Sequence, residues 1–297
     1  MNTQDTQDTQ VSRRSMFSGG MTKAVAAAGV AMAATAVASE AKAQMAPSGI
    51  GDADILNFAL NLEYLESEFY LRGVTGQGLD QAAGSSMGGQ VRGGRQVSFS
   101  NPIHRSFLDD VARNELAHVI FLRTALGAGA VQRPTLDFNA GFAAVAQAAG
   151  LGAFDPFADE ASFFMAAFLF EDVGVTAYKG AAPLLKSKKF LDAAAGIHAV
   201  EAYHAGCIRT VLYKMGAPAQ ETAGRISKVR DTLGGGDGHD QGIVRDGHAN
   251  IVPADENSVA YGRTAQHVLN IVLANGSAGV TQGGFFPDGL NGKIQST

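Results

Sequence analysis

The sequence contains a single cysteine, Cys207, among its 297 residues, so no internal disulfide can form. Its stability must therefore come from a packed core and from any bound metal, even in an oxidising compartment. In this setting we interpret Cys207 as a small buried apolar residue.

Basic residues are in slight deficit, because 23 Lys and Arg stand against 28 Asp and Glu. Proteins that bind nucleic acid usually carry a basic stripe or face, with which they neutralise phosphates. No such stripe is visible in this mildly acidic chain. The composition therefore argues against a nucleic-acid partner and is typical of a soluble globular protein.

Apolar runs long enough to cross a bilayer are also missing, since a span needs roughly 20 residues. The apolar run from Ala24 to Ala38 is shorter than that, which argues against a transmembrane anchor. It follows the pair Arg13-Arg14 and precedes a small-x-small cleavage site, Ala41-Lys42-Ala43. We interpret residues 1–43 as a twin-arginine export signal, which predicts a periplasmic or otherwise exported protein without a stable membrane span. Because this route passes folded proteins, a cofactor could be loaded before export.

Helical periodicity is plain in four segments of the remaining chain, 44–297, which is long enough for one ample core. The predicted helices are Asp54 to Arg72, Pro102 to Leu126, Asp159 to about Pro183, and Lys188 to Met215. In each of them a charged residue falls inside the apolar stripe. These charged side chains are therefore predicted to point at the core.

One pattern is written twice along these helices: a lone Glu, a Tyr seven residues later, and then a Glu-x-x-His triplet. The first copy is Glu63, Tyr70, Glu115 and His118, and the second is Glu171, Tyr178, Glu201 and His204. Residues three apart share a helix face, so each triplet directs a carboxylate and an imidazole to the same side. With each Glu on its own helix, four carboxylates and two imidazoles can meet at one point.

An ionised carboxylate in an apolar core is costly unless it is paired or bound to a metal. Two divalent ions would balance four carboxylates, and two neutral imidazoles would complete the coordination. The sequence therefore predicts a two-metal site, with manganese or iron equally acceptable to these ligands. Scattered buried ion pairs are the less specific alternative.

Other residues near the predicted site have less certain roles. Glu66 lies one turn beyond Glu63 and could replace it as a ligand, although the spacing to the tyrosine favours Glu63. Tyr70 and Tyr178 either orient carboxylates through their hydroxyls or simply pack. His198 precedes Glu201 by one turn and is better explained as a core histidine than as a seventh ligand. Asp172 is expected to turn away from the metals.

These residues resemble the ferritin-like superfamily, which includes bacterioferritins, rubrerythrins and manganese catalases. The segments Ile55 to Glu66, Asn114 to Val119 and Gly283 to Gly292 are most similar to the desiccation-related ferritin-like proteins. The resemblance covers the chain from about Asp54 onward. It implies an all-α four-helix bundle with a long crossover between its second and third helices. It also implies metal ligands at the six repeated Glu and His positions, all of which are filled here.

The connections suggest how the rest of the chain is organised. The bundle is assigned to residues 44–215, and 216–297 form a C-terminal extension that is polar and glycine-rich before a further helix at about Ser258 to Ala274. A long insert, Gly73 to Asn101, either caps the mouth of the site or is a mobile loop. The crossover, Gly127 to Ala158, is expected to include a short helix near Phe142 to Ala149. The Gly- and Phe-rich tail is interpreted as a subunit clasp or a lid.

Three functions fit this site. The first is manganese-catalase-like chemistry on hydrogen peroxide, with a small-molecule oxidant as the only required partner. The second is diiron oxidation of ferrous iron with dioxygen or peroxide, although the insert and tail would hinder the tiling of a storage shell. The third is a non-enzymatic desiccation or stress protein with a structural metal. A homo-oligomer is expected in each case, because exposed bundle faces commonly pair.

Overall fold

A computed structural model describes residues 49–297, and four long helices dominate this part of the chain. They are α2 (Asp52–Thr75), α4 (Pro102–Leu126), α6 (Glu160–Ala181) and α7 (Lys188–Lys214). Each overlaps one of the predicted helices, and the ends differ by three residues at most. The all-α fold class is confirmed. The predicted export signal, 1–43, lies outside the described residues.

Local capping explains where these helices begin and end. Asn101 accepts a hydrogen bond from the amide of Ile103, and Pro102 occupies the first helical position, where its missing N–H is not needed. Asp159 and Ser187 cap α6 and α7 in the same way. Gly76 ends α2 in the left-handed region at φ 78°, which a side chain would disfavour. The helix boundaries are therefore encoded locally, which explains why they could be predicted.

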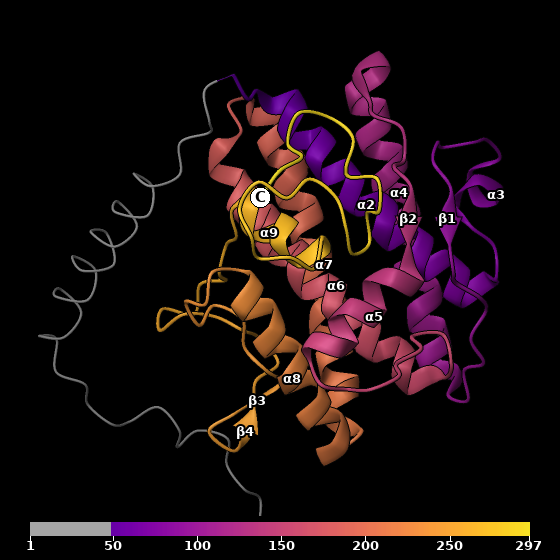
Figure 1. The fold of residues 1–297 in the computed structure, drawn as a ribbon, viewed down its shortest axis with the longest axis vertical. Helices are drawn as coiled ribbons and strands as arrows, with labels where there is room; N and C mark the ends of the chain where they lie inside the picture. The colour runs from indigo at the N-terminus through magenta and orange to yellow at the C-terminus, as the bar shows by residue number, and fades with distance from the viewer. Residues whose placement is uncertain (1–48) are drawn as a thin grey trace, which may run out of the picture. The chain divides into compact units, whose positions relative to one another are not determined.

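The four helices pack as two pairs, α2 with α4 and α6 with α7, and Figure 1 shows them side by side. Only the short segment Ala182–Leu184, a 3-10 turn, and three further residues join α6 to α7, as in neighbouring antiparallel helices. Within the described residues, α6 with this turn is the one helix long and apolar enough to cross a membrane. Since 89% of its apolar window is buried inside the protein, it has the character of a core helix.

Shorter elements complete the described chain. They are α3 (Leu79–Ala83), β1 (Val91–Arg92), a 3-10 turn (Gly127–Gly129), β2 (Leu136–Asp137), α5 (Phe138–Ala148), α8 (Ala217–Leu233), β3 (Val244–Arg245), β4 (His248–Ala249) and α9 (Ala265–Val272). Strands β1 and β2 pair in parallel, and β3 and β4 form a small hairpin. The predicted crossover helix is α5, which begins earlier than expected because Asp137 caps it.

Two expectations for the C-terminal extension were wrong. Helix α8 lies in the stretch that we expected to be polar and irregular. The last helix begins at Ala265 rather than Ser258, because Arg263 is held in a loop by a hydrogen bond from its amide to the carbonyl of Thr176, and Thr264 then caps α9. The carbonyl of Arg263 would lie 1.9 Å from a Cβ on Gly180, so only glycine permits this approach to α6.

A buried ion-pair cluster fixes the insert between α2 and α4. Arg133, from the crossover, pairs with Glu68 of α2 and with Asp80 of α3, its Nη1 lying 3.0 Å from Asp80 Oδ1. Arg133 is 4% exposed and Glu68 is fully buried. Breaking such a pair would leave an uncompensated buried charge. The insert is therefore anchored to the bundle and is not a freely mobile loop.

A second charged cluster attaches α8 and the following loops to the bundle. Asp172 accepts hydrogen bonds from Arg209 Nη1 and Arg230 Nη2, each at 2.7 Å, and Arg230 also binds Asp240. Both of these guanidinium groups are fully buried. As predicted, Asp172 turns away from the neighbouring Glu171, and it holds α8 in place. Cys207, by contrast, is exposed, which corrects its interpretation as a buried apolar residue.

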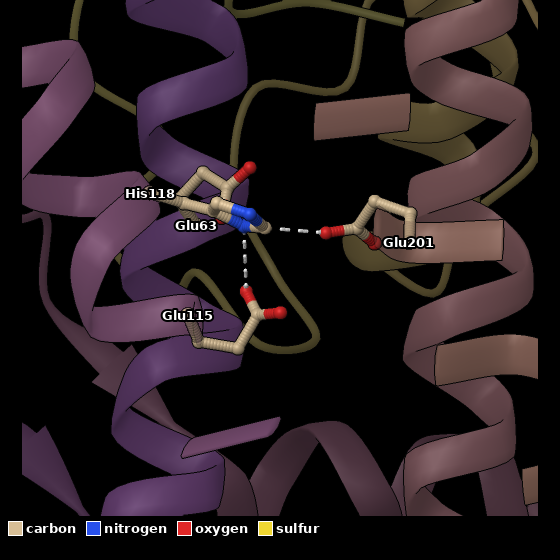
Figure 2. Close-up of side chains that lie close together, drawn as sticks. All are labelled: Glu63, Glu115, His118 and Glu201. Atoms are coloured by element: carbon tan, nitrogen blue, oxygen red, sulfur yellow. Dashed lines mark hydrogen bonds and ion pairs between the residues drawn. The ribbon is translucent and has the colours of Figure 1, made fainter. Parts of the chain in front are cut away.

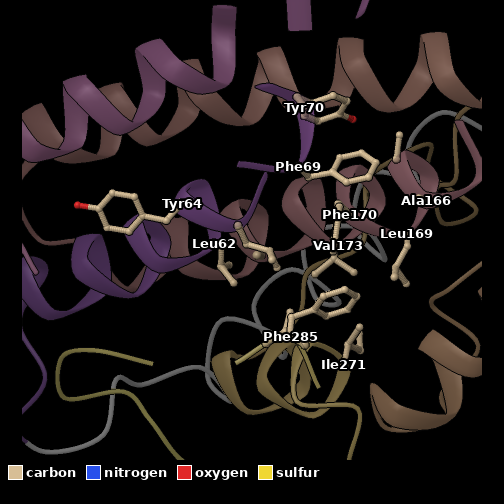
Figure 3. Packing of buried hydrophobic residues seen from close by; sticks show 14 of the residues in the cluster. Leu62, Tyr64, Phe69, Tyr70, Ala166, Leu169, Phe170, Val173, Ile271 and Phe285 are labelled. Atoms are coloured by element: carbon tan, nitrogen blue, oxygen red, sulfur yellow. The ribbon is translucent and has the colours of Figure 1, made fainter. Parts of the chain in front are cut away.

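The C-terminal tail packs on the same chain's bundle. Asn61 of α2 donates to the carbonyl of Asn291 at 2.8 Å and accepts from its amide at 3.0 Å. Phe285 contacts Phe142 and Phe170, with ring centroids 4.9 and 5.0 Å apart (Figure 3). These contacts place the tail over α2, α5 and α6, which is a lid-like position.

Candidate metal centre

The six predicted ligands come from all four long helices. Glu63 lies on α2, Glu115 and His118 on α4, Glu171 on α6, and Glu201 and His204 on α7. All four carboxylates are fully buried, and the two histidines are 8% and 4% exposed. The three-residue spacing within α4 and within α7 places each Glu and His on one inward face, as expected for a helix. The structure therefore brings the six residues together.

Their side chains form two overlapping groups of four residues. In each group, one potential ligand atom from every residue lies within 4.8 Å of the other three. One group contains Glu63, Glu115, His118 and Glu201, and the other contains Glu115, Glu171, Glu201 and His204. Glu115 and Glu201 belong to both groups, so they are the two residues that two metal ions could share. Each remaining Glu and His pair is placed to hold one ion.

Both imidazoles direct the same ring nitrogen at the carboxylates. His118 Nδ1 lies 3.2 Å from Glu63, 3.5 Å from Glu115 and 3.6 Å from Glu201 (Figure 2). His204 Nδ1 lies 3.1 Å from Glu115 and 3.4 Å from Glu171. These separations suit ligands that surround a common ion, and the arrangement repeats on both sides of the site.

Several atoms of this group are buried and have no hydrogen-bond partner among residues 49–297. They are both carboxylate oxygens of Glu115 and Glu201, Glu171 Oε2 and His204 Nδ1. A buried polar atom without a partner is costly, and a native protein normally satisfies it. Carboxylate and imidazole are donors that manganese and iron both accept. The residues present therefore fit a pair of divalent metal ions, while the individual ligand assignments stay predictions.

Burial and crowding set the protonation of the metal-free site. Burial raises the pKa of Glu63 to about 7 and raises the pKa of Glu201 well above its usual range. Burial opposes charge on His118 and His204, but the adjacent carboxylates outweigh it and raise their pKa values to about 11 and about 10. Both imidazoles also hold the pKa of Glu115 below its ordinary value. At neutral pH the two imidazoles are therefore protonated, and burial favours the neutral form of Glu201.

Metal loading should therefore release protons. Metal ligands must be deprotonated, so filling the site at pH 7 displaces at least the two imidazole protons per chain, and metal affinity falls as the pH is lowered. The measurement is a calorimetric titration of the metal-free protein with Mn²⁺ in buffers that differ in ionisation enthalpy. A heat that is independent of the buffer would contradict this protonation scheme.

The two tyrosines bind carboxylates across the site. Tyr70 donates to Glu171 Oε1 at 2.6 Å, and Tyr178 donates to Glu63 Oε1. Each hydroxyl thus holds a glutamate of the other sequence copy and leaves that carboxylate's second oxygen directed at the centre. The orienting role, left open by the sequence, is the one that these contacts support.

Asn114 was not recognised as a site residue from the sequence. Its side-chain amide lies 3.2 Å from His204 Nε2, the ring nitrogen that points away from the carboxylates. A histidine that binds metal through Nδ1 carries its proton on Nε2, so in a metal-loaded site Nε2 would donate to the Asn114 amide oxygen, with the amide turned so that this oxygen faces the ring. The sequence offered one indication of this role, because Asn114 directly precedes Glu115. Adjacent helical residues point in different directions, and the side chain of Asn114 reaches His204 on α7.

The alternate ligands lie outside both groups. Glu66 is buried beside the site but belongs to neither, which favours Glu63 as the α2 ligand. His198 is half-buried, and its Nδ1 has no hydrogen-bond partner within the described chain. Burial lowers the pKa of His198, so a neutral imidazole is favoured there. These positions agree with a neutral histidine near the core rather than a seventh ligand.

Gly174 makes room for the carboxylate of Glu201, which belongs to both candidate ligand groups. A Cβ at this position would lie 2.1 Å from Glu201 Oε2 and 3.3 Å from Glu66 Oε1. Real side chains do not approach this closely, so any other residue would displace Glu201. Glycine in the middle of a helix is normally unfavourable. A glycine is present here on α6 because the carboxylate of Glu201 occupies the space that a side chain would need.

Substituting this glycine should weaken metal binding. Gly174→Ala is expected to push Glu201 aside and to lower metal affinity roughly 10- to 100-fold, as a misplaced ligand does. The matched control is Gly196→Ala on α7, where an added Cβ meets nothing within 4 Å. The control should keep its metal and gain about 0.5–1 kcal/mol of stability from the helix. Metal content after dialysis compares the two, and equal content would contradict the steric argument.

The chain resembles known proteins over most of its length. The ferritin-like domain family matches residues 51–214, a range that includes all six candidate ligands. Ferritin-like catalase Nec2 of Nesocodon mauritianus is 31% identical over 274 residues, covering 84% of this chain and 87% of that protein. Desiccation-related protein PCC13-62 of Craterostigma plantagineum is 29% identical over 267 residues, covering 82% and 84%.

Proposed function

Because the chain belongs to the ferritin-like domain family, we propose that its six converging side chains hold two metal ions and that the loaded protein disproportionates hydrogen peroxide. The family resemblance predicted from the sequence is confirmed by the match and by both relatives. The reaction and the metals remain our proposal.

The single observation that carries the proposal is the set of orphaned atoms at the centre. Four fully buried carboxylates converge there, and most of their inward oxygens lack a protein donor. Without metal they avoid repulsion only by taking up protons. Two divalent ions would neutralise them and satisfy the same atoms. This charge balance supports a site built for two metals rather than one.

The chain's own residues would perform distinct tasks around the metals. When bound, the ions would supply the redox couple that accepts electrons from one peroxide and returns them to another. Glu115 and Glu201 would hold the two ions at a fixed separation, and the tyrosines would keep Glu63 and Glu171 in place. Glu66, outside both ligand groups, is a carboxyl group that could take up and return peroxide protons.

Peroxide chemistry is preferred over iron storage for two reasons. One relative is named a ferritin-like catalase, and it matches this chain over most of both lengths. The anchored insert and the tail packed across α2 and α6 add bulk to the outer surface, which hinders the close tiling of a storage shell. Manganese is the metal that we favour, with iron as the alternative.

Metal content and oxygen release together test this proposal. Protein purified from the exported fraction should contain two manganese ions per chain and release oxygen on addition of hydrogen peroxide. The same protein stripped of metal, and an equal concentration of free Mn²⁺, serve as controls. Iron without oxygen release would favour a ferroxidase instead. Little or no metal would favour a non-enzymatic stress role, which the name of the second relative supports.

We also propose that the protein works outside the cytoplasm. The support is the twin-arginine pattern at Arg13-Arg14 with its apolar run and cleavage site. Replacing both arginines with lysine should leave the protein in the cytoplasm, as cell fractionation would detect. An unchanged exported fraction would contradict this route.

A further inference from the structure

A cavity of about 10 Å³ lies between α2, α6 and α9. We call it the Glu66 cavity, because Glu66 is its only ionisable lining residue. The remaining lining residues are Leu62, Leu65, Leu169, Phe170, Val173, Gly174, Ile271, Val272 and Phe285. A space of this size is about that required by one water molecule. The cavity can therefore accept one water-sized molecule and excludes larger organic compounds.

Glu66 gives this apolar cavity one polar contact. Glu66 is 4% exposed, and it is the one carboxyl group among the described residues that line the cavity. A carboxyl group buried in this way normally needs a partner. A small hydrogen-bonding molecule in the cavity would provide that partner.

The cavity adjoins the candidate metal centre through Gly174. A Cβ on Gly174 would meet both Glu66 Oε1 and Glu201 Oε2, so the two carboxylates converge on the space that this glycine leaves. Glu201 belongs to both ligand groups. A molecule hydrogen-bonded to Glu66 is therefore one side chain away from Glu201.

The outer wall of the cavity comes from the C-terminal extension. Ile271 and Val272 of α9 and Phe285 of the tail face Val173 and Phe170 of α6 (Figure 3). The amide of Phe285 donates to the carbonyl of Val272 at 2.9 Å, and its carbonyl accepts from the amide of Asp137 at 3.0 Å. These bonds hold the aromatic ring in place. This wall of the cavity is therefore fixed by backbone hydrogen bonds.

We propose that the Glu66 cavity is the entry site through which one uncharged, water-sized oxidant reaches the metal centre. This inference rests on the proposed function for the identity of the oxidant as hydrogen peroxide. The apolar lining disfavours ions, and the volume rejects organic hydroperoxides. Glu66 is the hydrogen-bonding group that receives the molecule at the inner end.

Two substitutions can fill the cavity from opposite walls without touching a proposed ligand. Val173→Ile adds a methyl group from α6, and Val272→Ile adds one from α9. Val268→Ile on α9 is the matched control, because Val268 is fully buried and does not line the cavity. Crystal structures of the metal-free proteins should show one ordered water beside Glu66 in the wild type and in the control. Both filled variants should lack it.

Nitric oxide, a neutral diatomic molecule, measures entry separately from catalysis. The measurement uses protein loaded with ferrous iron. Because the probe must displace tightly packed atoms, its binding rate in stopped flow should fall roughly tenfold in each filled variant and stay unchanged in the control. Metal content must be equal in all four proteins. Wild-type rates in both filled variants, or a wild-type cavity without water, would overturn the proposal.

The two proposals can fail independently in this design. If the wild type releases no oxygen from peroxide but the filled variants still bind nitric oxide slowly, the entry site stands and the catalase function does not. If oxygen is released equally by all four proteins and nitric oxide binding is unchanged, the function stands and the entry site is wrong.

Discussion

Glu115→Ala is expected to reduce bound metal from two ions to less than one per chain and to lower oxygen release more than 100-fold. Glu115 belongs to both ligand groups and lies 3.1 Å from His204 Nδ1 and 3.5 Å from His118 Nδ1. In the proposed two-metal site, its loss would remove a ligand from each ion and one of the four balancing negative charges. Loss of a shared ligand should cost more than the 10- to 100-fold typical of outer-shell partners.

The matched control for this variant is Glu66→Ala, which also removes a buried glutamate next to the site. Glu66 lies outside both groups, so this variant should retain two metals even if its activity falls. The number of metal ions per chain in the two variants is measured by elemental mass spectrometry, with protein quantified by amino-acid analysis. Two metals in Glu115→Ala, or metal loss only in Glu66→Ala, would show that the ligand assignment is wrong.

Asp172→Ala should destabilise the metal-free protein by about 3–5 kcal/mol, because it removes the carboxylate that pairs with the buried Arg209 and leaves Arg230 with Asp240 alone. Arg209 and Arg230 are fully buried, and both donate to Asp172 Oδ2. For a chain of this size the melting temperature should fall by roughly 10 °C. Thermal unfolding of the metal-free protein measures the effect without interference from metal binding.

An exposed ion pair on α8 provides the comparison. Glu221 and Arg225 pair on α8 with side chains that are 67% and 49% exposed. Exposed pairs contribute about 0–1 kcal/mol, so Glu221→Ala should change the melting temperature by only a few degrees. Similar losses in the two variants would mean that the buried cluster does not hold α8 to the bundle.

The bundle and its ligands could be predicted because they depend on local patterns. Pro102 to Leu126 was predicted with the boundaries that the structure has, since its Asn cap and apolar stripe lie within the helix itself. Glu115 and His118 were identified because three-residue spacing fixes their shared face. The duplicated pattern then indicated which helices must meet. No long-range information was needed for these steps.

Helix α8 was missed because its buried face is only half apolar, with Ala223 and Ile226 as its apolar residues. Ser227 and Arg230 lie on that face, and Arg230 packs over the ring of Phe168 with its guanidinium carbon 4.2 Å from the centroid. A helix that is anchored partly by charge gives only a weak apolar stripe to detect. Its partners, Asp172 and Asp240, are distant or loop residues, so only the folded chain reveals the cluster.

The position of the tail was also beyond prediction. Asn61 and Asn291 are 230 residues apart, and nothing in the sequence pairs them. The same holds for Phe285, which closes the cavity beside Glu66. Gly174 illustrates the opposite case, since a glycine within an apolar helical stripe is a visible signal, although its reason is a carboxylate from another helix.

The crossed tyrosine contacts make the two sequence copies mutually dependent. Tyr70 of the first copy holds Glu171 of the second, and Tyr178 of the second holds Glu63 of the first. Neither half of the duplicated unit could orient its own glutamate if it were produced as a separate fragment. A change to the tyrosine of one half would therefore alter the position of the glutamate in the other half.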